Sequence, residues 1–130
     1  MDSSKSDDRW QRGLEAYASQ FEVEPTEVFS YLEERIGPRM ATEAIYAAGA
    51  AWTDDVLSLR DRSLIVLAAL AAQGGVEPRM RPHVRWAIEH GATPEELEAM
   101  MSLLAVYVGY PRASVAMQVV REVLEEMRTG

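Results

Sequence analysis

The residues best suited to chemistry gather in segment 57–83, which reads LSLRDRSLIVLAALAAQGGVEPRMRPH. Arginines stand at its start, an apolar helical stretch follows, and further arginines surround His83. Arginine binds carboxylates bidentately, and a histidine with a pKa near neutrality can accept or deliver a proton. The segment therefore predicts anion binding and acid/base chemistry beside an apolar wall.

A metal site is not predicted from the two histidines of the chain. His90 follows His83 by seven residues, which span about 10 Å along a helix, too far for both side chains to reach one ion readily, even with Glu77 or Glu89. His90 also directly precedes Gly91, where a cation meets the helix dipole favourably. We therefore interpret His90 as a helix-capping residue.

Structural alternatives exist for the other candidates. Arg60 and Arg62, with Asp61, could form a solvated first helical turn or an ion pair between subunits. A lone histidine such as His83 is often a structural residue whose ring nitrogens are hydrogen-bonded, although three neighbouring arginines favour a function. Both interpretations stay open at this point.

Composition and charge restrict the class of protein. A chain of 130 residues fits one domain, and a net charge of −8 argues against a nucleic-acid partner. The absence of cysteine excludes disulfides, thiolate metal sites and thiol catalysis. The N-terminus is polar, and the longest apolar run, 64–72, is about half of the roughly 20 residues of a membrane helix. We expect a cytoplasmic protein with no membrane partner.

Helical signals occur along almost the whole chain, which predicts an all-α fold of six to seven helices. We expect a flexible tail over 1–8 and a single domain over 9–130. Apolar residues three or four apart predict a first helix that ends at Phe21, and Pro25 opens a second that Gly37 and Pro38 close. A third, alanine-rich helix over 39–51 follows, whose small residues permit close helix approach.

The later helices are marked by their ends. Ser58 caps a helix that stops at Gly74 and Gly75. A helix around His83 should start late, because Pro82 precedes the histidine, and Glu77 should lie in the loop. Thr93 and Glu96 form a capping box for a helix that reaches Gly109, and a last helix covers about 111–127.

Several motifs together resemble the carboxymuconolactone decarboxylase family. They are Trp52, LSLRDRSLIVLAALAA, HVRWAIEHG, TPEEL and AVYVGYPRA, in order over 52–126. The resemblance implies a compact all-α fold of the alkylhydroperoxidase D-like type and assembly as a homo-oligomer, a trimer or hexamer. We expect no cofactor and no metal.

The resemblance also separates two branches of that family. In the peroxidase branch, a Cys-x-x-Cys pair precedes the histidine that matches His83, and a glutamate stands where this chain has Ser63. A chain without cysteine cannot cycle through that disulfide. The tripeptide Arg62-Ser63-Leu64 resembles the decarboxylase branch, which acts on a small carboxylated lactone. Members of that branch often carry glutamate where this chain has Arg79.

The chemistry implied is decarboxylation or proton abstraction on a small anionic lactone or oxo-acid, which needs stabilisation of an enolate and a group that moves a proton. We expect His83 to be the acid/base and Arg62 or Arg85 to bind the anion. Further substrate-binding candidates are Arg79, Arg81, Tyr107 and Trp52. The alternatives are an isomerase or cyclase on a related substrate, and a noncatalytic oligomeric protein with an anion pocket.

Overall fold

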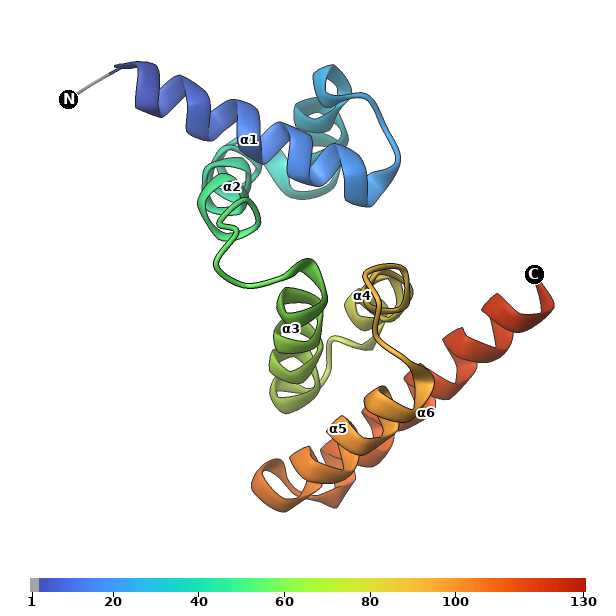
Figure 1. The fold of residues 1–130 in the computed structure, drawn as a ribbon. Coiled ribbons are helices and arrows are strands. Elements are labelled where there is room, and N and C mark those ends of the chain that lie inside the picture. The colour runs from blue at the N-terminus through green and yellow to red at the C-terminus, as the bar shows by residue number, and fades with distance from the viewer. Residues whose placement is uncertain (1–2) are drawn as a thin grey trace. The chain divides into compact units, whose positions relative to one another are not determined.

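The computed structural model describes residues 3–130, with side chains from residue 8 onward apart from that of Ala50. It confirms the predicted all-α fold, because the described residues form helices and turns and no strand. Contacts group the chain into two compact units, Met1–Val56 and Leu57–Gly130. Figure 1 shows the helices of each unit, coloured by position along the chain.

The N-terminal unit contains α1 (Ser3–Phe21), a short 3₁₀ helix η1 (Pro25–Glu27) and α2 (Val28–Ala51). Helix α1 begins at Ser3, earlier than the end of the expected tail over 1–8, and residues 1 and 2 lie outside the described part. The flexibility of that tail stays a prediction. Gly37 is non-helical, with φ 82° and ψ 163°, and breaks α2 where Gly37 and Pro38 predict a helix end. The two segments predicted on either side of this break are thus confirmed.

Two glycines allow α1 and α2 to approach closely. A Cβ atom added to Gly13 would lie 1.9 Å from the Ile45 carbonyl oxygen, and one added to Gly49 would lie 2.1 Å from the Arg9 carbonyl oxygen. Neither distance leaves room for a side chain. The close approach predicted for this region thus occurs, but glycines, more than the alanines of 39–51, make it possible.

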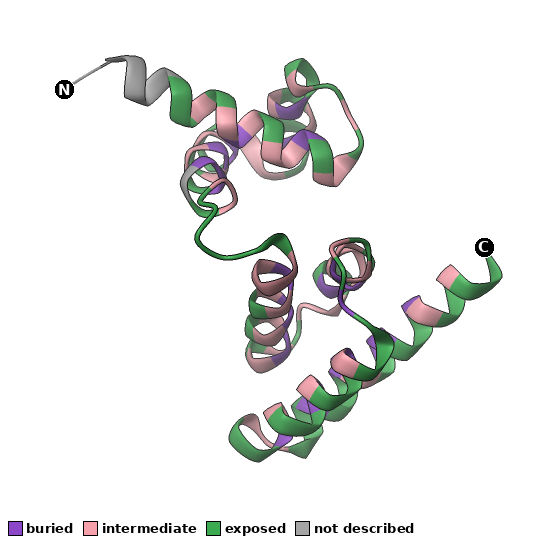
Figure 2. Cartoon of the chain, viewed as in Figure 1, coloured by how far each residue is buried: buried purple, intermediate pink, exposed green. Residues whose placement is uncertain are grey.

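The C-terminal unit contains α3 (Leu59–Gln73), α4 (Glu77–Glu89), α5 (Pro94–Val108) and α6 (Tyr110–Thr129). Their buried positions, coloured purple in Figure 2, recur on one side of each helix and form one apolar core. Its largest fully buried side chains include Leu67, Met80, Val84 and Leu97. The core therefore holds all four helices of this unit together.

The predicted caps of this unit are confirmed. The Ser58 hydroxyl accepts a hydrogen bond from the Asp61 backbone N–H at 3.1 Å, and α3 ends at Gly74, whose φ is 72°. Thr93 and Glu96 exchange both bonds of the capping box. Each cap links residues close in sequence, which is why the pattern alone predicts it.

The start of α4 differs from the prediction. The helix begins at Glu77, and Pro82 lies inside it. Pro82 has no backbone N–H, so the helix lacks one hydrogen bond, the one to the Pro78 carbonyl. The fixed φ of proline nevertheless suits helical backbone. The Glu77 carboxylate accepts a hydrogen bond from the Gly75 N–H at 3.2 Å. Helix α4 therefore carries His83 in its second turn instead of at its first residue.

None of the helices in the described part of the chain is long and apolar enough to cross a membrane.

Candidate active site

His83 lies in α4 with its ring partly buried. The Trp86 ring meets it edge to face, with 4.7 Å between the ring centroids. Burial lowers the pKa of His83 to about 4, because transfer away from water disfavours the charged imidazolium. At neutral pH this side chain is therefore an uncharged imidazole against an aromatic wall.

The two arginines on either side of His83 point to a different neighbour. Arg81 forms ion pairs with Glu122, at 3.0 Å, and with Glu126, and Arg85 binds Glu126 at 2.9 Å. Both carboxylates belong to α6. The hydrogen bond to Glu126 is the main cause that raises the pKa of the Arg81 guanidinium. These two arginines thus already hold anionic partners.

Helical geometry explains why the arginines and the histidine separate. Residues two positions apart differ by about 200° around a helix, so Arg81 and His83 lie on different faces of α4. The predicted ring of arginines around His83 exists in the sequence but not as one cluster in space. Arg79, the third member, is exposed near the start of α4. A role for Arg79, Arg81 or Arg85 in substrate binding stays a prediction, and for the last two it requires that ion pairs open.

The predicted candidates outside α4 lie in varied surroundings. Arg62 is partly buried in the first turns of α3, the helix that packs against α4. Tyr107 lies near the end of α5 with 81% of its surface exposed. Trp52 caps the C-terminus of α2 and belongs to the N-terminal unit. Of these, Arg62 is the cation on a helix directly packed against the helix of His83.

Arg60 forms an ion pair with Glu96 of α5 and another, at 3.1 Å, with the adjacent Asp61. This partner on another helix of the same unit is one that the sequence analysis did not weigh. Arg60 thus joins the start of α3 to the first turn of α5.

A polar pair at the other end of α4 was missed by the sequence analysis. The Ser63 hydroxyl of α3 lies 2.7 Å from Nδ1 of His90, and Ser63 is fully buried. The interpretation of His90 as a cap is confirmed for its backbone, since His90 is the C-cap of α4 and its N–H donates to the Trp86 carbonyl at 2.8 Å. Its side chain, however, bonds to α3. The antiparallel order of two helices joined by a short loop is the signal that could have indicated the pair, because it brings the start of α3 to the end of α4.

Possible metal ligands are dispersed in the described part of the chain. Within the described residues, no group of three or more histidine, aspartate or glutamate side chains could hold a metal ion.

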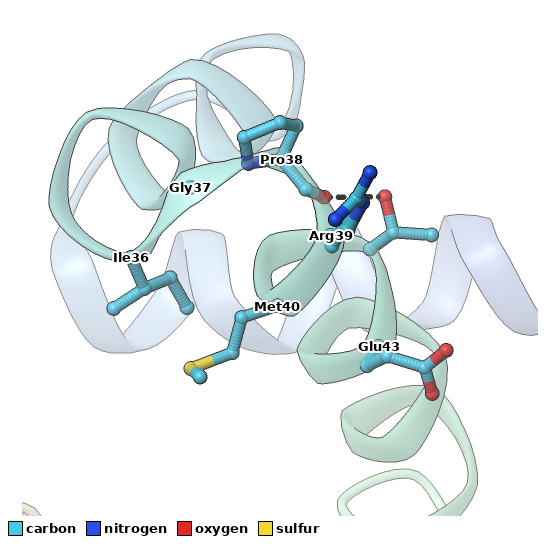
Figure 3. A pocket seen from close by; sticks show the side chains of 7 residues that line it. Ile36, Gly37, Pro38, Arg39, Met40 and Glu43 are labelled. Carbon is cyan, nitrogen blue, oxygen red and sulfur yellow. Dashed lines mark hydrogen bonds between the residues drawn. The ribbon is translucent and has the colours of Figure 1, made fainter.

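A large open cavity lies in the N-terminal unit at the break in α2. It has a volume of about 1030 Å³ and is lined by residues 36–40, Thr42 and Glu43. Figure 3 shows Arg39 and Glu43 among its lining side chains, together with the hydrogen bond of 2.8 Å from the Thr42 hydroxyl to the Pro38 carbonyl. None of the predicted site residues lines it.

Comparison with known proteins gives two matches. Residues 40–122 match the model of the carboxymuconolactone decarboxylase family, a stretch that starts in α2 and ends in α6. A 4-carboxymuconolactone decarboxylase of Acinetobacter baylyi is 32% identical over 82 residues, which are 63% of this chain and 60% of that protein. The match thus spans less than two thirds of the relative's own length. Because the family model covers well over half of the sequence, this chain belongs to the carboxymuconolactone decarboxylase family.

Proposed function

We propose that the protein is a cofactor-free carboxy-lyase that acts on a small carboxylated lactone or oxo-acid. Membership of the family supports a decarboxylase-like function, and the similar protein of Acinetobacter baylyi is named for 4-carboxymuconolactone. The observation that carries the proposal is His83, an imidazole that burial keeps uncharged beside Trp86. Uncharged imidazole can accept a proton through one nitrogen and donate through the other.

The proposed reaction breaks the carbon–carbon bond to the substrate carboxylate. Carbon dioxide leaves, and the electron pair of that bond moves into the conjugated lactone carbonyl to give an enolate. Arg62 pairs with the developing oxyanion, and a proton added to carbon completes the product. An anionic substrate beside His83 raises the pKa of the imidazole, so that the histidine can take up a solvent proton and deliver it.

We further propose that the protein works as a homo-oligomer. Ten large hydrophobic side chains are exposed in the described part of the chain, among them Leu103, Val106, Tyr107 and Tyr110 near the turn between α5 and α6. Exposed apolar groups of this kind mark surfaces that another chain covers. Tyr107 would meet substrate only if a second subunit lay against it.

The test is release of carbon dioxide from 4-carboxymuconolactone by the wild type, His83→Ala and Arg62→Ala at equal folded concentration. We expect turnover by the wild type, its loss in His83→Ala and a raised KM in Arg62→Ala. Turnover that survives in His83→Ala contradicts the assigned acid/base. A wild type that binds the lactone without turnover contradicts the lyase and favours the binding protein.

A further inference from the structure

A groove between α5 and α6 joins two adjacent cavities. The first has a volume of about 340 Å³ and the second about 550 Å³, and both are lined by Glu98, Met117 and Arg121. Volumes of this size match sites for small organic molecules. None of the residues in the proposed active site lines either cavity, so this groove is a separate feature.

The groove has an apolar floor and polar sides. Met101 and Ala113, which are 2% and 4% exposed, lie at its base with the partly buried Met117. Ser102 and Ser114 add hydroxyl groups along its sides. Methionine adapts its shape to a flat apolar group, so the floor suits an aromatic or short aliphatic body.

Arg121 differs from the other arginines of α6. The Arg112 guanidinium donates to the Ala72 carbonyl at 2.6 Å, and Arg128 is bound to Glu125. Arg121 is exposed and forms no ion pair with any described residue, although Glu98 lines both cavities and Glu95 and Glu125 line the second. An unengaged guanidinium beside an apolar floor is suited to bind a carboxylate bidentately.

We propose that this groove is a second ligand site, which binds a small hydroxylated aromatic acid. The carboxylate pairs with Arg121, the ring lies on Met101 and Met117, and the hydroxyl group donates to the Glu98 carboxylate. A ligand without a donor at its far end would meet Glu98 with unfavourable charge. The groove therefore selects an acid that carries a hydroxyl group at the end opposite its carboxylate.

The experiment titrates 4-hydroxybenzoate into the full chain and follows affinity by calorimetry and the methionine methyl signals by NMR. We expect Met101 and Met117 to shift while Met40 and Met80 do not. Arg121→Gln should weaken binding by about tenfold or more, since a charge-assisted pair is lost. Arg39→Gln, which also removes one exposed arginine charge, is the matched control and should bind as the wild type does.

The neutral amide, 4-hydroxybenzamide, tests the charge directly. It should bind the wild type about tenfold more weakly than the acid, and Arg121→Gln should remove this difference. Equal binding of the acid to wild type and Arg121→Gln, or shifts confined to Met40 or Met80, overturns the proposal. An absence of binding also overturns the proposal. If the oligomer mass then falls in Arg121→Gln, the groove is covered by a second copy of the chain. Carbon dioxide release is assayed separately, so failure of this proposal leaves the lyase proposal unaffected.

Discussion

Helix α4 presents two faces that treat charge in opposite ways. Toward α6, Arg81 and Arg85 form ion pairs with Glu122 and Glu126. On another face, burial keeps His83 uncharged beside Trp86. The two faces differ in their access to solvent. Water screens the ion pairs on the face toward α6, whereas partial exclusion of water from the other face disfavours a charged imidazolium at His83. One short helix thus separates exposed ion pairs with α6 from a partly buried group fit for proton transfer.

The largest expected difference between the two faces of α4 is in enzymatic activity. His83→Gln should lower kcat/KM for 4-carboxymuconolactone by about a hundredfold or more, since loss of a general acid/base costs roughly 10²–10⁴ in rate. Arg85→Gln should stay within about threefold of the wild type, because Arg85 binds a carboxylate of its own chain. Steady-state kinetics at equal folded concentration measures both. A large loss in Arg85→Gln with intact His83 would place the anion site on the α6 face.

Stability separates the buried pair at the end of α4 from the exposed ion pairs. Ser63→Ala should lower the free energy of unfolding by about 1–3 kcal/mol, because it leaves His90 Nδ1 without the buried hydroxyl group. Ser114→Ala, which removes an exposed hydroxyl that donates to the Pro111 carbonyl at 3.1 Å, is the matched control and should change little. Urea unfolding monitored by circular dichroism measures both variants. Equal losses would mean that burial of Ser63 adds nothing.

The pH dependence of stability sharpens the statement that His83 is uncharged. Its folded pKa, about 4, lies below the ordinary 6.5, so the unfolded chain binds more protons between these values. Stability is therefore fully present above about pH 6.5 and is lost as the pH falls toward 4. The loss due to His83 should be on the order of 1–2 kcal/mol after allowance for partial exposure. Urea midpoints at pH 7 and pH 4.5 should differ less in His83→Gln than in the wild type; an equal difference would assign the acid sensitivity to other groups.

The smallest effect is expected at the α6 face. Glu126→Gln removes an acceptor of both Arg81 and Arg85, yet these side chains are substantially exposed, so the loss of stability should be small. High salt should reduce this cost further, because it screens exposed charges. Thermal unfolding at low and high ionic strength measures the effect. A cost that salt does not change would show that the pairs are more protected from water than their exposure indicates.

Much of the fold could be predicted because its signals are local. Ser58, Thr93 and Glu96 cap helices through residues three positions away, and Gly74 leaves a helix where only glycine adopts its φ without strain. The start of α4 was predicted wrongly because Pro82 was given the first position. Pro78, nearer the loop, fits that role, and Pro82 costs the helix one hydrogen bond.

The candidate site was less predictable, because it depends on which faces meet. His83 could be chosen from its type, its place among arginines and the resemblance to a family. The ion pairs of Arg81 with Glu122 and Glu126 join residues more than 40 positions apart, and the bond of Ser63 to His90 joins residues 27 apart. No local pattern links such residues.

The sequence by itself determined the helical class, most helix ends, the absence of thiol chemistry and the position of the histidine, because each follows from residue type or from neighbours within one helical turn. Only the tertiary structure decided that two arginines beside His83 bind α6, that Ser63 bonds to His90 and that Arg121 lies in a groove. Burial and pairing depend on packing between helices, and packing also sets the pKa of His83. The residues that can do chemistry are thus written in the sequence, while their charge states and partners are set by the fold.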